Sequence, residues 1–197
     1  VTFKVEELLD PGKYKGKQYH LKYGFVDLKS GKMSSRLGKV LTAAEVIESA
    51  KERVSKITED KAIAETVAVG AVKYSMLKQG TIQSMTFDTN ESVNLQGNSG
   101  PYVQYTYART QSVLHKSLLQ GPSLKFSFKD GPYRDYNQEE LAILRWLYRF
   151  PEVVESAAKE YAPSSVCTYL YELAQRYNTF YNRHSILGRV NKGDSGN

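Results

Sequence analysis

A loop with the sequence GKMSSRLGK brings three cations and two hydroxyls together within nine positions. The cations are Lys32, Arg36 and Lys39, and the hydroxyls belong to Ser34 and Ser35. Cationic and hydroxyl donors at this spacing can bind the oxygens of a phosphate group. The ordinary alternative is a solvated basic turn, so the hypothesis of a phosphate site needs further observations.

The positive charge of the chain is concentrated around this loop. The whole sequence of 197 residues has a formal net charge of +6. Residues 1–40 contain nine Lys and Arg against four Asp and Glu, whereas the remainder contains 18 against 17. A local basic field attracts the phosphate of a nucleotide or of a nucleic-acid backbone, which favours the phosphate-site hypothesis.

The neighbouring elements would hold the loop between a strand and a helix. YHLKYGFVDL, residues 19–28, is rich in aromatic and branched side chains and predicts a strand. Thr42 and Glu45 have the spacing of a capping box, and apolar residues then recur at helical spacing as far as Ile57. Because the N-terminus of a helix attracts anions, this helix also favours a phosphate ligand.

A second set of residues suited to binding nucleic acid lies in GPYVQYTYAR. Tyr102, Tyr105 and Arg109 lie at i, i+3 and i+7, and therefore on one face of a helix. Tyr181, in a later predicted helix, could extend the same patch. A tyrosine stripe at helical spacing is more often core packing. The alternative is a platform on which unstacked bases lie against tyrosine rings and an arginine.

The rest of the chain has a mainly helical pattern. Thr58 is predicted to cap a second helix that ends near Gly80. Two apolar faces are expected to bury this helix on both sides. One is formed by Ile63, Val67, Ala71, Tyr74 and Leu77, and much of the other by Val69, Val72 and Met76. The next residues, up to 98, are expected to be irregular, with a short helix near Asp88. Four more helices, predicted to form a bundle, cover residues 99–120, 139–150, 152–161 and 163–184.

Composition argues against several classes of site. The three His and the single cysteine, Cys167, show no metal-ligand spacing, so neither a zinc site nor a disulfide framework is expected. One cysteine also fits a reducing cytoplasm. No apolar stretch approaches the length that crosses a bilayer. The sequence opens at Val1 without an initiator Met, which indicates a piece of a longer chain.

Two motifs together point to a family. KMSSR after a predicted strand resembles the nucleotide-binding loop of class I aminoacyl-tRNA synthetases. LQGNSGPYVQYTYART resembles the segment of arginyl-tRNA synthetases in which a Gly-Asn-Ser-Gly-Pro-Tyr run leads into Gln-Tyr and then Arg. The order and separation of the motifs match, as do YHLKYGFV before the loop and FPEVVESAAKEYAPSSVCTYLYELAQRYNTFY near the end. The resemblance covers essentially the whole chain.

The resemblance implies a division into three parts. Residues 1–41 would be the end of a Rossmann-type catalytic domain, 42–98 connecting helices, and 99–197 a helical anticodon-binding domain truncated at its C-terminus. The implied fold class is mainly α, a helical bundle preceded by a short α/β remnant. The His-Ile-Gly-His-type motif and the arginine-binding residues of the family are absent from these residues. The chain alone is therefore expected to be inactive in arginine activation.

The resemblance also assigns roles by motif position. It implies that Lys32 and Arg36 are catalytic. The implied ATP-binding residues are Lys32, Met33, Ser34, Ser35, Arg36 and Lys39. The implied anticodon-binding residues are Tyr102, Tyr105, Arg109 and Tyr181. Ser35 and Leu37 stand where many class I synthetases have lysines, so the division of the phosphate role among the three cations of the loop stays open.

The implied activity is ATP-dependent activation of arginine and its transfer to tRNA(Arg). The whole enzyme would use ATP with Mg²⁺, and this portion would hold no metal of its own. It would act as a monomer in the cytoplasm, with no membrane partner. A stand-alone tRNA- or RNA-binding module without catalysis is the first alternative, and a structural helical bundle with a basic edge is the second. The KMSSR loop favours the ligase, because a binding module has no use for a pyrophosphate clamp.

Overall fold

The computed structural model describes residues 1–29, 42–119 and 136–186. These stretches are mainly helical with one small parallel sheet, which confirms the predicted fold class. The first half contains α1 Thr2–Leu9, α2 Pro11–Tyr14, β1 Val26–Leu28, α3 Ala43–Val54, α4 Lys61–Leu77, β2 Met85–Phe87 and α5 Thr89–Ser92. The second half contains α6 Gly100–Leu119, α7 Gln138–Tyr148, α8 Phe150–Lys159 and α9 Pro163–Arg183.

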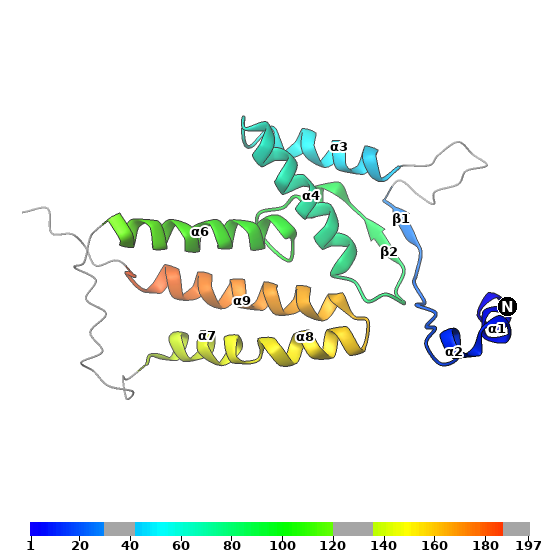
Figure 1. Ribbon diagram of the computed structural model, residues 1–197. Helices are drawn as coiled ribbons and strands as arrows, with labels where there is room; N and C mark the ends of the chain where they lie inside the picture. Colours follow the sequence, from blue (N-terminus) through cyan, green and yellow to red (C-terminus); the bar gives the residue numbers. More distant parts are fainter. Residues whose placement is uncertain (30–41, 120–135, 187–197) are drawn as a thin grey trace, which may run out of the picture.

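The second half forms a helical bundle with α9 in its middle. Figure 1 shows α6 on one side of α9, and α7 followed by α8 on the other. Pro151 lies in the first turn of α8, where its missing N–H has no helical acceptor to lose. The four helices predicted for this half are confirmed, with ends that differ by no more than two residues.

Two reciprocal hydrogen bonds fasten α7 to α9. The Trp146 indole Nε1 donates to the Tyr169 carbonyl over 3.1 Å, and the Tyr169 hydroxyl donates to the Trp146 carbonyl, also over 3.1 Å. The two rings are stacked, with centroids 5.6 Å apart. Tyr169 is buried, and this burial raises the pKa of its hydroxyl. Each aromatic residue thus satisfies the other's buried polar group while filling the space between the helices.

The first half is organised around α4, which contacts α3, α5, α6 and α9. The core between α3 and α4 is made of small residues, namely Ala50, Val54, Ala64 and Ala68. The predicted capping box at the start of α3 is confirmed: the Glu45 N–H donates to Thr42 Oγ1, and the Glu45 carboxylate accepts from the Thr42 N–H.

The cap of α4 differs from the prediction. Its N-cap is Asp60, whose Oδ1 accepts hydrogen bonds from the N–H groups of Ala62 and Ile63. The assignment of Thr58 as the cap is therefore wrong. The Thr58 hydroxyl oxygen instead accepts from the Asp60 N–H, so it braces the residue that caps the helix.

The buried face of α4 also differs from the prediction. Ala71 and Tyr74 of the predicted face are buried, whereas Ile63 is 52% exposed and Leu77 is 45% exposed. The buried residues are mostly small, namely Ala64, Ala68, Ala71, Tyr74 and Ser75. The physical reason is close packing on more than one side, since backbones can approach only where side chains are short. Hydropathy alone favours the larger residues, so it misplaces Ile63 and Leu77 and misses Ala64 and Ala68.

The strand prediction over residues 19–28 holds only at its end. β1 begins at Val26, and it pairs in parallel with β2 in the register Val26↔Met85 to Leu28↔Phe87. β2 lies in a segment expected to be irregular, whereas the predicted short helix there is confirmed as α5. Ahead of β1, the Gly24 N–H donates to the Thr81 carbonyl, and a Cβ on Gly24 would lie 2.4 Å from the Gln83 backbone. This contact needs a glycine.

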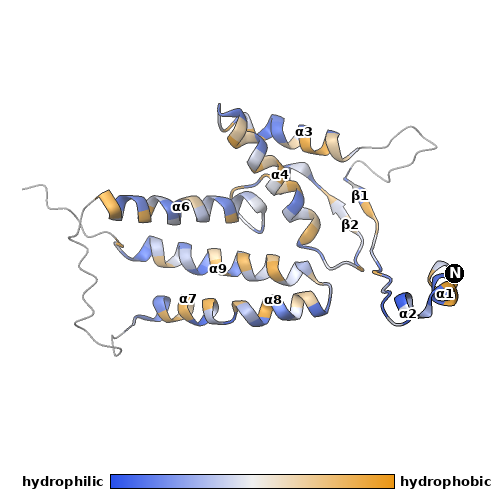
Figure 2. Cartoon of the chain, viewed as in Figure 1, coloured by the Kyte–Doolittle hydropathy of each residue, from blue (hydrophilic) through white to orange (hydrophobic). Residues whose placement is uncertain are grey.

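The N-terminal helices α1 and α2 were not predicted, and they lie to one side of the bundle (Figure 1). Figure 2 shows apolar residues on α1, where Leu8 and Leu9 are both largely exposed. Within the described stretches, no helix has the length and apolar character needed to span a membrane.

Candidate nucleic-acid interface

The predicted phosphate loop lies outside the described residues. This applies to Lys32, Met33, Ser34, Ser35, Arg36 and Lys39. On its C-terminal side, the described chain resumes at Thr42, the N-cap of α3. The Thr42 N–H donates to the Glu45 carboxylate over 2.7 Å, and this bond, with a second from the Thr42 hydroxyl, lowers the pKa of Glu45. The capping box thus gives the loop a defined exit into a helix.

On its N-terminal side, the loop follows β1 and Lys29. Lys29 Nζ lies 2.9 Å from Asp88 Oδ2, and the hydrogen bond from Lys29 is the main cause of a lowered pKa at Asp88. Asp88 is also the N-cap of α5 and accepts from the Asn90 N–H over 2.8 Å. Arg53 of α3 donates to the Asn90 side-chain oxygen. Lys29 before the loop and the C-terminal end of α3 after it are therefore tied to the same short helix.

The predicted base-binding residues come together across α6 and α9. The Arg109 guanidinium lies 4.8 Å from the ring centroid of Tyr105 and 4.7 Å from that of Tyr181. Arg109 Nη2 also donates to the Tyr105 hydroxyl over 3.2 Å. Sequence spacing alone put Tyr105 and Arg109 on one face, and the structure adds Tyr181 from the facing helix. The three side chains form one cation–π cluster.

Asn178 joins this cluster and was not among the predicted residues. Its Oδ1 accepts from Arg109 Nη1 over 2.6 Å. Its Nδ2 donates to the Tyr102 hydroxyl over 3.1 Å and to the Thr106 hydroxyl over 2.9 Å. A signal was available in the sequence, since Asn178 precedes Tyr181 by three residues and so shares its face of a helix.

Burial distinguishes the members of the cluster. Tyr105 is 51% exposed, whereas Tyr102, Arg109 and Tyr181 are half-buried. The Tyr102 ring packs against Tyr171 of α9 at a tilted angle, with centroids 5.5 Å apart. Tyr102 therefore takes part in packing, while Tyr105 leaves much of its ring open to solvent. Fully buried core tyrosines would not have this pattern.

The aromatic surface continues along α9. Tyr177 lies one turn before Tyr181, with ring centroids 6.1 Å apart. Burial is the main cause of a raised pKa at Tyr177, with Tyr181 adding to it and Arg109 opposing it. The hydroxyl therefore stays protonated and remains available as a hydrogen-bond donor at neutral pH.

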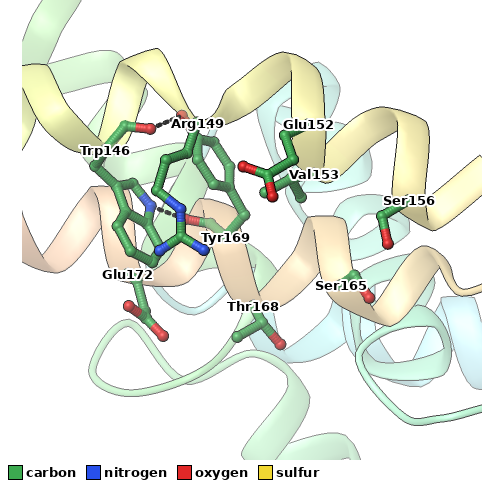
Figure 3. Close-up of a pocket in the computed structure, with 9 residues that line it drawn as sticks. All are labelled: Trp146, Arg149, Glu152, Val153, Ser156, Ser165, Thr168, Tyr169 and Glu172. Carbon is green, nitrogen blue, oxygen red and sulfur yellow. Dashed lines mark hydrogen bonds between the residues drawn. The ribbon is translucent and has the colours of Figure 1, made fainter.

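A groove lies elsewhere in the bundle, between α8 and α9. It has a volume of about 350 Å³ and is lined by Trp146, Arg149, Glu152, Val153, Ser156, Ser165, Thr168, Tyr169 and Glu172 (Figure 3). Arg176 lies 3.8 Å from the Trp146 ring centroid and is paired with Glu172, whose carboxylate is 3.0 Å away. The charges lining the groove are mixed, and none of the predicted site residues lines it.

Metal binding has no candidate in the described residues. No group of three His, Cys, Asp or Glu side chains there could hold a metal ion. Cys167 is a free, buried thiol on α9, and burial raises its pKa. A raised pKa disfavours the thiolate that metal binding and nucleophilic catalysis require.

Comparison with known proteins gives consistent matches. Residues 103–194 match the model of the DALR anticodon binding domain. The chain is 39% identical over 182 residues to the arginine–tRNA ligase of Flavobacterium psychrophilum, covering 86% of this chain and 29% of that protein. It is 40% identical over 183 residues to the arginine–tRNA ligase of Treponema denticola, covering 86% of this chain and 30% of that protein.

Solved structures give the same picture. The arginyl-tRNA synthetase of Thermus thermophilus matches with a TM-score of 0.69 and 28% identity, over 88% of this chain and 29% of that one. The arginyl-tRNA synthetase of Plasmodium falciparum shares the fold, with a TM-score of 0.66 and 20% identity over 91% of this chain. The chain thus spans about three tenths of the length of the relatives it matches.

Proposed function

Because the chain belongs to the arginine–tRNA ligase family and carries its DALR anticodon-binding domain, we propose that it is part of an arginine–tRNA ligase. The whole enzyme would activate arginine with ATP and transfer it to tRNA(Arg). This portion would contribute the loop that stabilises the pyrophosphate and the helices that bind the anticodon. The observation that carries the proposal is the cluster around Arg109, which lies within the DALR match.

The anticodon role rests on the chemistry of that cluster. Tyr102, Tyr105, Arg109 and Tyr181 would contact the unstacked bases of the anticodon loop. Tyr105 has an open ring face, and a base stacked on an aromatic ring contributes about 1–3 kcal/mol. Arg109 lies over two rings of its own protein, so it would act through its N–H edge rather than as a stacking surface.

The loop role rests on its donor set. Lys32, Ser34, Ser35 and Arg36 offer cations and hydroxyl donors, which fit the oxygens of ATP phosphates and do not fit a divalent metal. Lys32 and Arg36 would stabilise the charge that develops on the leaving pyrophosphate, with Lys39 as a third cation and Met33 within the motif. The Mg²⁺ that accompanies ATP would be held with the nucleotide in the whole enzyme.

The domain division is part of the same proposal. Residues 1–41 would be the end of the catalytic domain, and 99–197 would belong to the anticodon-binding domain. Residues 42–98 would be the helices that connect the two. Lys29 and Arg53 both bond to residues of the α5 region, which supports a connector that contacts the chain on both sides of the loop. The whole enzyme would work as a monomer in the cytoplasm.

The test compares two activities of the full-length ligase carrying Arg109→Ala. We expect the dissociation constant of tRNA(Arg) to rise at least tenfold, while arginine-dependent ATP–pyrophosphate exchange stays at the wild-type rate. The isolated 197-residue chain should show no exchange. Exchange by the isolated chain, or unchanged tRNA affinity in the variant, would count against the proposal. A stand-alone RNA-binding module predicts in addition that the full-length protein shows no exchange.

A further inference from the structure

The side-chain amide of Asn178 sits between α6 and α9 and has all of its hydrogen-bonding groups in use. Its oxygen accepts from Arg109 Nη1 at 2.6 Å, a short distance typical of a charge-assisted bond. Its nitrogen donates to Tyr102 and Thr106, at 3.1 and 2.9 Å. A guanidinium has only donors, so the atom that faces Arg109 must be the oxygen.

Thr106 fixes the same orientation independently. Its hydroxyl hydrogen is used on the Tyr102 carbonyl, over 2.9 Å, so toward Asn178 the Thr106 oxygen can only accept. The atom of Asn178 that faces the Thr106 hydroxyl must then be the nitrogen. Two neighbours thus agree on one direction for the amide, and a reversed amide would oppose donor to donor at Arg109 and acceptor to acceptor at Thr106.

The direction of the Asn178 amide determines where the hydroxyl hydrogens of two tyrosines can point. The Tyr102 oxygen accepts from Asn178, and the Tyr105 oxygen accepts from Arg109 Nη2. Within the described part of the chain, neither hydroxyl hydrogen has an acceptor of its own. Each is therefore available to donate to a ligand, beside the Arg109 N–H groups that have no acceptor among the described residues.

We propose that Asn178 is a positioning residue that holds the Arg109 guanidinium in place and leaves the Tyr102 and Tyr105 hydroxyls as donors, so that this surface selects hydrogen-bond acceptors of the tRNA. The ligand group is an oxygen or unprotonated ring nitrogen of an unstacked base, or a phosphate oxygen next to it. An exocyclic amino group is disfavoured, because it would face donors. The inference rests on the proposed function and specifies the chemistry of the same site.

The first test uses the full-length ligase and an unmodified tRNA(Arg) transcript. Asn178→Ala should raise the dissociation constant of the transcript about tenfold, the effect of losing one well-aligned charged contact. Thr179→Ala is the control, since it removes only a hydroxyl bonded to the Gln175 carbonyl within α9. Adding Asn178→Ala to Arg109→Ala should weaken binding little further, because Asn178 acts through Arg109. Additive effects would overturn the inference.

A second variant separates the positioning of the Arg109 guanidinium from the direction of the Tyr102 hydroxyl hydrogen. Asn178→Asp keeps an acceptor for Arg109 but has no N–H for Tyr102, so the Tyr102 hydroxyl must turn inward to donate. We expect its tRNA affinity to stay below that of the wild type even though Arg109 is held. Wild-type affinity in Asn178→Asp would overturn the inference.

Modified anticodon stem–loop RNAs identify the group that is recognised. Replacing single base carbonyl oxygens with sulfur, a weak acceptor, should reduce the affinity of the wild type and have less effect on Asn178→Ala. Methylphosphonate substitution at single phosphates tests whether the recognised acceptor is a phosphate oxygen instead of a base atom. Sensitivity only to removal of exocyclic amino groups would overturn the inference. A wild-type enzyme that binds no tRNA would overturn the proposed function as well, whereas a binding-competent enzyme indifferent to Asn178→Ala overturns the inference alone.

Discussion

Gly100, the first residue of α6, lies directly against the backbone of Gly70 in the middle of α4. A Cβ on Gly100 would lie 2.6 Å from the Gly70 carbonyl oxygen and 3.0 Å from the Ala71 Cα. The start of α6, and with it the stretch that carries Tyr102, Tyr105 and Arg109, is therefore placed by a contact between two main chains. The same contact explains why a small residue, Ala71, is buried at this point of α4.

Gly100→Ala should destabilise the fold by about 1–3 kcal/mol, because the added methyl meets backbone atoms that cannot turn away. Gly70→Ala is the matched control. Its Cβ would meet the side chain of Gln104, at 2.4 Å from Nε2, and that side chain can move. Alanine also gains about 1 kcal/mol of helix propensity over glycine. Urea denaturation of both variants should show the larger loss for Gly100→Ala, and equal losses would contradict the backbone contact.

The hydroxyl of Tyr74 links α4 to α9 and to the loop before α6. It donates to the Cys167 carbonyl over 3.0 Å and lies 2.6 Å from the side-chain oxygen of Asn98. Tyr74→Phe should cost about 1–2 kcal/mol, because it removes a hydrogen bond in a largely buried place. Thermal unfolding measures this effect. The exposed Tyr148 offers a control, since Tyr148→Phe should leave the melting temperature unchanged.

The raised pKa of the same hydroxyl leads us to expect a loss of stability at alkaline pH. Burial is the main cause of the raised pKa of Tyr74, and Tyr169 and Tyr177 also have raised pKa values because they are buried. Above about pH 10, tyrosines of the unfolded chain release their protons while these three keep them in the folded state. The folded state then binds more protons, so the contribution of these three tyrosines to the free energy of unfolding is complete below pH 10 and is lost as the pH rises above it.

Urea titrations at successive pH values would measure this slope. Tyr74→Phe should make it shallower, since one of the three groups no longer titrates. An unchanged slope in the variant would show that Tyr74 does not contribute. A stability that rises between pH 10 and 11 would contradict the prediction for all three residues.

Local signals in the sequence were sufficient for several helix boundaries. The Thr42–Glu45 capping box, Pro163 at the start of α9 and Gly121 beyond the end of α6 each mark a helix boundary by chemistry within a few residues. The predicted boundaries of α6 to α9 agree with the structure within two residues, whereas α1 and α2 were not predicted and the cap of α4 was misplaced. Tyr105 and Arg109 were likewise placed on one face by helical spacing alone.

What the sequence did not predict depends on contacts between distant residues. β1 and β2 are three residues each and are 59 positions apart in register, so neither shows an alternating pattern long enough to detect. The buried face of α4 follows from the approach of α3 and α6. The spacing of Asn178 from Tyr181 puts both on one helical face, but the bonds of Asn178 to Arg109 and Tyr102 became visible only when α9 was packed against α6. Asn is common on helix surfaces, and its type gives no hint of its three partners.

The loop role makes a kinetic prediction for Lys32, which lies outside the described residues. In the full-length ligase, Lys32→Ala should lower the maximal rate of arginyl-adenylate formation far more than it weakens ATP binding, because the cation acts on charge that develops during the reaction. Pre-steady-state adenylation at several ATP concentrations separates the two effects. A change confined to the apparent ATP affinity would contradict the proposed clamp.

The last prediction concerns Tyr105, whose ring lies beneath Arg109 and is half exposed. Tyr105→Ala in the full-length ligase should weaken tRNA binding by about 1–3 kcal/mol, the contribution of one stacked base. Because the ring is not enclosed, its removal should lower stability by much less than the roughly 3–5 kcal/mol of a buried aromatic. ATP–pyrophosphate exchange should be unchanged.

Tyr105→Phe completes this experiment, since it keeps the stacking surface and removes only the hydroxyl that accepts from Arg109. We expect it to fall between the wild type and Tyr105→Ala in tRNA affinity, with stability close to that of the wild type. The opposite pattern is a large drop in melting temperature for Tyr105→Ala with tRNA affinity unchanged. That result would show that Tyr105 stabilises the packing of α6 and does not bind a base, so the surface around Arg109 would lack its stacking residue.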